Sequence, residues 1–229
     1  MVKAAIAASS ITQIDADAVV VALQRHGEDI RVAPTSESIP QDVRSDLERL
    51  FTAVGAGTGT GDTTIIPAPA PIAARVVIGV SLGAPRDDLG AHEVLRRAAG
   101  SAARAGRAYE SLAFALPVAD AREAGAVLEG ALLGGYSFDD FRTTTAKPTK
   151  TAAITVLGAA DAEGAVRRAE SLAESVGFCR DLVNTPPGHL RPSAFTDRVL
   201  AAATAAGLEC EVLDSDRLRS EGSGGILQA

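Results

Sequence analysis

Short apolar runs separated by helical patterns dominate the chain up to residue 158. Six of these runs are rich in alanine and β-branched residues: 4–8, 18–23, 63–66, 76–81, 112–116 and 153–157. Nearly continuous apolar runs of this length are typical of strands that are covered on both faces of a sheet. We therefore expect a sheet that is buried between two other layers.

The segments between these runs have helical spacing. Pro40 suits a first helical position, and Val43, Leu47 and Phe51 then repeat at the interval of one helix face. Segments 95–106 and 127–132 present two more faces, made mostly of small residues. Alternation of strands and helices predicts an α/β layered domain with a mixed or parallel sheet.

Residues 159–185 predict a longer helix. Asp161 can cap its start, Glu163 lies in its first turn and Arg180 in its last, all in agreement with the helix dipole. One apolar stripe follows the same segment: Val166, Ala169, Leu172, Ala173, Val176, Cys179 and Val183. A helix of about 23 residues spans roughly 35 Å, which is long enough to bridge two domains.

Two consecutive prolines, Pro186 and Pro187, end this helix because they lack backbone donors and block helical geometry. A new helix is expected from Pro192, a strand over 208–213 and a cap at Asp214. Such a fragment is too small to hold a core alone. We predict an N-terminal α/β domain (1–158), an interdomain helix and junction (159–187), and an incomplete second α/β domain (188–229).

Composition narrows the possible functions. The net charge of −7 and a pI near 5.0 argue against a nucleic-acid-binding surface, which requires clustered Lys and Arg. No apolar stretch reaches membrane-spanning length, so we expect a cytoplasmic protein. Cys179 and Cys210 have neither metal nor disulfide spacing and are predicted to be buried, reduced thiols.

The glycine-rich segment 55–62 invites interpretation as a phosphate-binding loop. Thr60 stands where the dinucleotide motif needs its third glycine, and no Gly-Lys-Ser/Thr ending follows. The segment also precedes a strand, whereas a phosphate loop follows a strand and opens a helix. A flexible connection is the favoured interpretation.

Other chemically suggestive residues do not combine into a site. Asp139 and Asp140 are adjacent, so on a strand they would point to opposite faces, and a solvated turn is favoured. His26, His92 and His189 are isolated from ligand-spaced partners and are predicted to be surface or loop residues. We therefore assign no catalytic, cofactor-binding or metal-binding residue in this chain.

Two segments carry a resemblance to a known family. The junction Arg180–Gly188, with its Asn-Thr-Pro-Pro, and the segment Glu129–Phe138, with its small residues and Tyr-Ser-Phe exit, resemble the leucyl aminopeptidase family. Segments 75–83 and 95–100 are similar to the strand, glycine turn and helix of that family's N-terminal domain. The resemblance covers nearly the whole chain in the correct order.

The resemblance implies an N-terminal domain like a macro domain, a long helix and a C-terminal catalytic domain. Members are typically hexameric and remove N-terminal residues from peptides with two divalent ions, commonly zinc, manganese or magnesium. Two ions can hold the substrate amine, activate a bridging water and polarise the carbonyl. The family's catalytic residues lie in later segments that match nothing here, so this chain alone is expected to be inactive and metal-free.

One tetrapeptide, 161–164, resembles the family's metal-binding Asn-Thr-Asp-Ala-Glu-Gly-Arg. Its flanking residues here are Ala160 and Ala165, and it comes before the junction instead of after it. A helix start is therefore favoured over a metal site. Two other functions stay open: a macro-like module that binds an ADP-ribose-type ligand near 55–61 or the Gly83 turn, and a DNA-binding regulatory domain.

Overall fold

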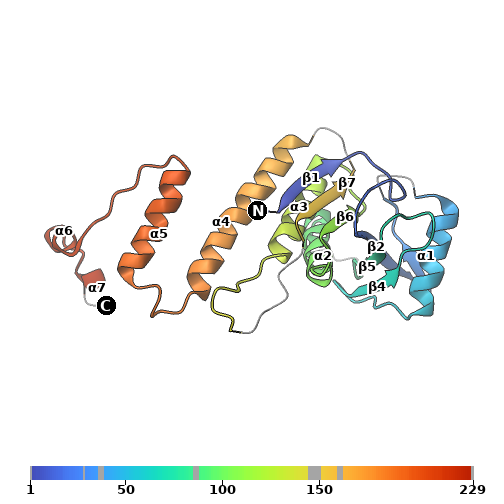
Figure 1. The fold of residues 1–229 in the computed structure, drawn as a ribbon, viewed down its shortest axis with the longest axis horizontal. Helices are drawn as coiled ribbons and strands as arrows, with labels where there is room; N and C mark the ends of the chain where they lie inside the picture. The colour runs from blue at the N-terminus through green and yellow to red at the C-terminus, as the bar shows by residue number, and fades with distance from the viewer. Residues whose placement is uncertain are drawn as a thin grey trace. The chain divides into compact units, whose positions relative to one another are not determined.

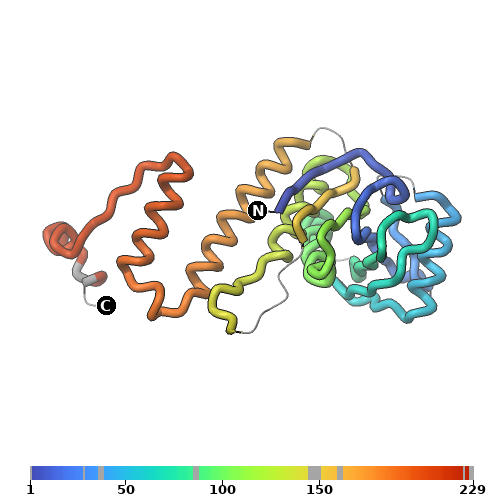
Figure 2. The backbone as a smooth tube through the Cα atoms, viewed as in Figure 1, coloured from blue at the N-terminus to red at the C-terminus, as the bar shows by residue number. Residues whose placement is uncertain are grey.

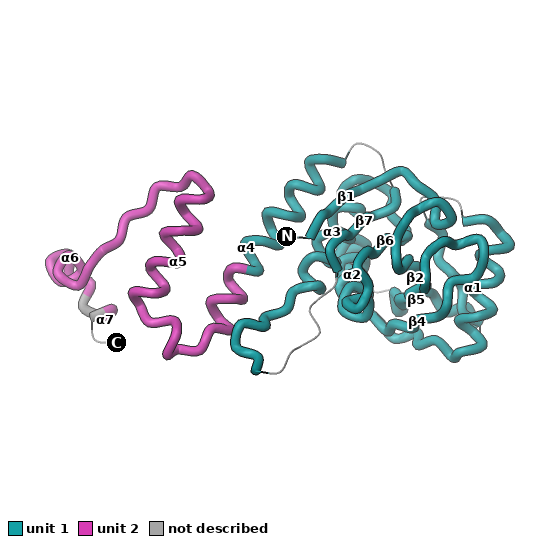
Figure 3. Tube along the Cα trace, viewed as in Figure 1, with its two compact units in different colours: residues 1–177 teal, residues 178–229 magenta. Residues whose placement is uncertain are grey.

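A computed structural model of the chain describes residues 2–27, 29–35, 39–84, 88–143, 151–158 and 162–227. The chain divides into two compact units, residues 1–177 and 178–229 (Figure 3). The division falls inside one helix, α4 (Glu163–Asn184). The predicted domain boundaries at 158 and 187 remain predictions.

Unit 1 is built on one sheet of seven strands: β1 (Lys3–Ala7), β2 (Ala18–His26), β3 (Asp29–Val32), β4 (Thr63–Pro67), β5 (Val76–Ser81), β6 (Ser111–Ala115) and β7 (Ala153–Leu157) (Figure 1). The order is β1-β7-β6-β2-β5-β4, and β3 pairs with β2. The five strands β1, β7, β6, β2 and β5 run parallel, while β3 and β4 are antiparallel to their neighbours. The six strands predicted before residue 158 and the mixed α/β sheet are confirmed.

The short strand β3 was not predicted from the sequence. It forms a hairpin with the far end of β2, from the pair Leu23 and Val32 to the pair His26 and Asp29. Gly27 makes the turn with φ +64°, a conformation that glycine adopts without steric cost. Only Ile30 and Val32 of this strand are buried.

Helices cover both faces of the sheet: α1 (Gln41–Ala53) on one, and α2 (Ala91–Ala105), α3 (Ala121–Gly134) and the first turns of α4 on the other (Figure 1). The buried run of β2 supplies both cores because successive side chains point to opposite faces. Val19, Val21 and Leu23 pack with Phe51 of α1. The alternate residues pack with α2 and α3. A strand that is buried on both faces therefore has a continuous apolar sequence.

Helices α2 and α3 approach so closely that glycine is required where they cross. A Cβ placed on Gly130 would overlap the carbonyl oxygen of Arg96, and one on Gly134 would overlap that of Gly100. Beside this crossing, the half-buried Arg96 donates from Nε to Oε2 of Glu129 at 3.1 Å. The small residues within Glu129–Phe138 thus serve backbone-to-backbone packing.

Unit 2 contains the end of α4 and three further helices, α5 (Pro192–Ala205), α6 (Ser215–Ser220) and α7 (Gly224–Leu227) (Figure 2). Thr185, in the predicted junction, is buried; its hydroxyl donates to the carbonyl of Asp181 at 2.6 Å and accepts from Arg198 of α5 at 3.0 Å. The helix from Pro192 is confirmed, and so is the Asp214 cap, which accepts from the backbone N–H of Asp216 and Arg217.

Two predictions for this region are wrong. Residues 208–213 form no strand: no strand in the described part of the chain pairs with them, and Glu209 and Glu211 are exposed. Cys179 and Cys210 are both exposed. The first lies on α4, where Ala169 is the only buried residue among those described, and the second lies in the unpaired segment. No helix in the described part of the chain is both long and apolar enough to cross a bilayer.

Candidate functional site

A cavity of about 620 Å³ opens in unit 1 where the parallel strands end. Its walls come from the ends of β2, β5 and β6, the first turns of α2 and the glycine-rich loop: Gln24, Arg25, Thr58, Leu82, Gly83, Ala84, Ala91, Val94, Leu95 and Pro117. The carboxyl edge of a parallel sheet is where α/β folds usually bind ligands. The volume lies within the usual range for small-molecule sites.

The two glycine segments that the sequence offered as alternatives meet at this cavity. Gly83 follows β5 with φ +75°, and a Cβ there would lie 3.0 Å from the Cα of Thr60. The N–H of Gly61 donates to the carbonyl of Ser81 at 2.9 Å, which fastens the loop to the end of β5. Thr58 and Gly83 therefore line the same cavity.

The glycine-rich loop is occupied by a side chain of its own. Oδ2 of Asp62 accepts from the N–H of Gly59 at 2.8 Å. A Cβ on Gly57 or Gly59 would lie 2.7 or 2.8 Å from that same oxygen. The glycines thus make room for the Asp62 carboxylate, which takes the place that an anion would occupy in a phosphate loop. The segment connects α1 to β4, in agreement with its interpretation as a connection.

The described lining of the cavity is mainly apolar. Leu95 is buried and Leu82, Val94 and Pro117 are half-buried. Arg25 is exposed near the end of β2, and no described residue forms a hydrogen bond or ion pair with its guanidinium. Among the described lining residues there is no carboxylate.

The nearest acidic group on α2 is already paired. Glu93, in the first turn, accepts from Nε of Arg97 at 2.7 Å and forms a second ion pair with Arg96. The hydrogen bond from Arg97 holds the pKa of Glu93 below its ordinary value, with Arg96 acting in the same direction and desolvation opposing both. Glu93 is consequently an anion whose charge is compensated within its own helix.

The chemically suggestive residues of the sequence are not assembled here. Asp139 and Asp140 are exposed after α3, His26 and His189 are exposed, and His92 is half-exposed in α2. Glu163 accepts from Arg167 at 3.3 Å in the first turn of α4, and Asp161 lies outside the described residues. Within the described ranges no three His, Cys, Asp or Glu residues gather as a metal site would require. None of these residues is among the described lining of the cavity.

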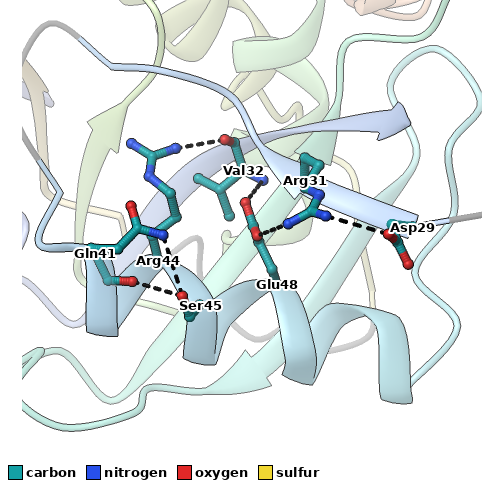
Figure 4. Close-up of polar contacts among 7 residues, drawn as sticks. All are labelled: Asp29, Arg31, Val32, Gln41, Arg44, Ser45 and Glu48. Carbon is teal, nitrogen blue, oxygen red and sulfur yellow. Dashed lines mark hydrogen bonds and ion pairs between the residues drawn. The ribbon is translucent and has the colours of Figure 1, made fainter. Parts of the chain in front are cut away.

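A second polar cluster, between β3 and α1, has a structural role (Figure 4). Oε1 of Glu48 accepts from the N–H of Val32 at 3.1 Å, and Oε2 accepts from Arg31 at 2.9 Å. Nη1 of Arg44 donates to the carbonyl of Val32 at 2.7 Å. Glu48, with a smaller effect from Asp29, raises the pKa of Arg31. These bonds attach β3 to α1.

Comparison with known proteins identifies relatives of this chain. Residues 19–145 match the sequence model of the N-terminal domain of the cytosol aminopeptidase family. A probable cytosol aminopeptidase of Streptomyces coelicolor is 40% identical over 93% of this chain and 45% of its own length. One from Streptomyces avermitilis is 42% identical over 96% and 46%. The chain thus spans less than half the length of these relatives.

Two solved structures are similar. The bottromycin maturation enzyme BotP superposes with a TM-score of 0.65 and 29% identity, over 90% of this chain and 41% of that protein. A mutant of tomato leucine aminopeptidase gives a TM-score of 0.76 and 18% identity, over 96% and 46%. At that identity the tomato enzyme supports the fold alone.

Proposed function

The chain belongs to the cytosol aminopeptidase family, and from that premise we propose that it is the N-terminal, non-catalytic portion of a metal-dependent leucyl-type aminopeptidase. The complete enzyme would remove N-terminal amino acids from peptides. One observation carries the proposal: the relatives named as cytosol aminopeptidases align with 93–96% of this chain, yet this accounts for only 45–46% of their own length.

The chemistry would belong to the remainder of the enzyme. There, two divalent ions, manganese or zinc, would activate water and polarise the scissile carbonyl. A structure of BotP, 30% identical to this chain, is described as a complex with Mn. In this chain the residues of the tetrapeptide at 161–164 that are described begin a helix, and Glu163 is paired with Arg167. This supports a helix start for that segment, and the metal ligands would come from elsewhere.

The role proposed for this part is structural. Its rigid sheet, covered by helices on both faces, would shape access to the active site and support assembly of a homohexamer in the cytoplasm. Peptide substrates would reach the metals through the catalytic domain. The acidic composition argues against nucleic acid as a partner. A regulatory role on DNA would require that the protein bind duplex DNA in a salt-sensitive manner.

A chimera tests the proposal. This chain replaces the aligned part of the Streptomyces coelicolor relative, and hydrolysis of leucine p-nitroanilide is measured with added Mn²⁺. The chimera is expected to hydrolyse the substrate and the 229-residue chain alone is not. Metal-dependent turnover by the chain alone would contradict the non-catalytic assignment, and a folded but inactive chimera would contradict the family role.

The cavity at the carboxyl edge favours one second candidate, a macro-like module for an ADP-ribose-type ligand. Its support is that the Thr58 loop and the Gly83 turn line one cavity of suitable volume. Against it, the Asp62 carboxylate fills the glycine loop that would otherwise cradle phosphate. Calorimetry with ADP-ribose tests this second function, and saturable binding with a micromolar Kd would support it.

A further inference from the structure

We propose that the outer edge of β1 binds a peptide in extended conformation, which would lie as an added strand beside the first turns of α4. β1 is the last strand on its side of the sheet, and β7 is its only partner among the described strands. Figure 1 shows α4 next to this edge strand. The recognition chemistry is backbone hydrogen bonding, by which extended peptides add to the edge of a sheet.

The pairing of β1 with β7 fixes the direction of its backbone groups. The N–H of Lys3 and the carbonyl of Ala7 form hydrogen bonds on the β7 side, at 2.8 and 3.2 Å. Because these groups alternate along a strand, the N–H and C=O of Ala4 and Ile6 point away from the sheet. No described residue forms a hydrogen bond with these outward groups. They present the donors and acceptors that an added strand requires.

The opposite edge of the same sheet, β4, is protected by a proline. The N–H of Ala68 donates to the carbonyl of Arg75 on the β5 side at 3.3 Å. Alternation from this bond places Thr63, Ile65 and Pro67 on the outer side of β4. Proline has no N–H, and on an edge strand it hinders further pairing. β1 contains no proline and pairs with β7 in an uninterrupted register, so β1 is the edge that is open to a further strand.

A groove of about 490 Å³ accompanies the outer edge of β1. Its described lining comes from β1 and the start of α4: Ala4, Ala5, Ile6, Ala162, Glu163, Val166 and Arg167. Ala4, Ile6 and Val166 pack against the same core, so their side chains lie on one face of the sheet. Alternate apolar side chains of an added strand would contact these residues. Glu163 and Arg167 form an ion pair at 3.3 Å, so the charges on the α4 wall compensate each other.

The groove favours a single strand over the sheet of a second copy. An added strand needs only the spacing between neighbouring strands, about 4.8 Å. A second copy would bring its own α4 to the same edge, where the first turns of α4 already form a wall. The choice of a free peptide as the occupant rests on the proposed aminopeptidase function. The recognition chemistry itself rests on β1 and the groove.

The test uses the 229-residue chain and isothermal titration calorimetry with the blocked peptide acetyl-Ser-Val-Thr-Val-Ser-amide. In antiparallel pairing, which is the more stable per residue, its two valines would lie opposite Ala4 and Ile6 and direct their N–H groups at β1. We expect saturable binding. N-methylation of both valines should weaken binding by roughly tenfold or more, because it removes these donors. N-methylation of the threonine, whose N–H points away from β1, should leave the Kd unchanged.

Two matched variants test the edge itself. Ala4→Pro removes one outward N–H of β1 without removing a bond to β7, so it should weaken binding and leave the urea midpoint unchanged. Ile65→Pro removes an outward N–H on β4 at the opposite edge, and binding should be unchanged.

Equal effects of the two methylated peptides, unchanged binding in Ala4→Pro, or no saturation at millimolar peptide would overturn the proposal. Self-association of the chain that Ala4→Pro abolishes would also overturn it, because this edge would then belong to a second copy. The methylated peptides test the same bonds on the native chain, whatever the stability of the variants. None of these outcomes affects hydrolysis by the chimera, so the two proposals fail separately.

Discussion

Gly130 of α3 shows how a single missing side chain sets the distance between two helices. Its Cα faces the carbonyl oxygen of Arg96 on α2, and any Cβ would overlap that oxygen. Glycine in a helix ordinarily costs about 0.5–1 kcal/mol relative to alanine because of its backbone entropy. Here that cost is outweighed by close packing of the two helices.

Replacement of Gly130 by alanine should therefore reverse the usual effect on helix stability. We expect Gly130→Ala to lower the free energy of unfolding by about 1–3 kcal/mol, since the carbonyl belongs to a rigid helix and cannot move aside cheaply. Gly177→Ala is the control: Gly177 lies within α4 with nothing within 4 Å of its would-be Cβ, so stability should stay the same or rise. Urea unfolding measures both, and equal effects of the two substitutions would contradict the packing argument.

Glu93 gives a pH-dependent prediction. Its pKa is lowered in the folded chain, chiefly by the hydrogen bond from Arg97. A carboxyl of this kind stabilises the fold at pH values above its unfolded pKa, and the contribution is lost as pH falls through the folded pKa. The difference in unfolding free energy between the native chain and Glu93→Gln should be largest near neutral pH and should shrink at pH values below the ordinary pKa of glutamate, about 4.3. Urea titrations at both pH values test this, and a gap independent of pH would show that the ion pairs are not its source.

The sequence showed which residue types occupy these positions, but not which residues they contact. The small residues of Glu129–Phe138 were visible, yet nothing in the sequence shows that Gly130 faces Arg96. Likewise, the glycines of 55–62 were correctly interpreted as a connection, but Asp62 was not recognised as the group that fills the loop. Its partner Gly59 lies three residues earlier in the chain, whereas an aspartate in an Asx turn bonds the backbone two residues later, so the usual turn pattern did not reveal this bond.

Among the secondary-structure elements, β3 depends on side-chain bonds more than on burial. It has four residues, of which Ile30 and Val32 are buried, and it is attached to α1 through Glu48 (Figure 4). Its alternation of charged and apolar residues is too short to distinguish from a turn, which is why the sequence did not predict it. Segment 208–213 shows the opposite error, because its apolar residues suggested a strand, yet none of the described strands pairs with it.

The attachment of β3 can be tested by removing its acceptor. Glu48→Ala leaves the buried N–H of Val32 without its partner, so we expect a loss of about 1–3 kcal/mol in unfolding free energy. Asp46→Ala on the same helix removes an exposed pair with Arg49 whose two side chains are 47% and 69% accessible, and should change stability by at most about 0.5 kcal/mol. Comparable losses in the two variants would mean that Glu48 contributes only as a surface charge.

At the scale of the whole molecule, the sequence predicted the layered unit well because both faces of its sheet are buried. Each predicted strand run found a partner, and the alternate residues of β2 supply two separate cores. The cavity was harder to predict, because its walls come from segments that meet only once the parallel strands end at a common edge. Nothing in the sequence indicated that the cavity is lined by Gln24, Arg25 and Pro117. The Gly83 turn, in contrast, was considered as part of a ligand site.

The burial pattern also predicts where the stability of the chain resides. The last buried hydrophobic residue among those described is Ala169, and the only buried residue described in unit 2 is Thr185. Stability follows buried apolar area, so a chain ending after Asn184, which keeps α4 complete, should unfold cooperatively with the same urea midpoint as the 229-residue chain. Residues 178–229 alone should show no cooperative transition by circular dichroism. A large drop in the midpoint of the shortened chain would mean that unit 2 stabilises unit 1, contrary to the distribution of buried residues.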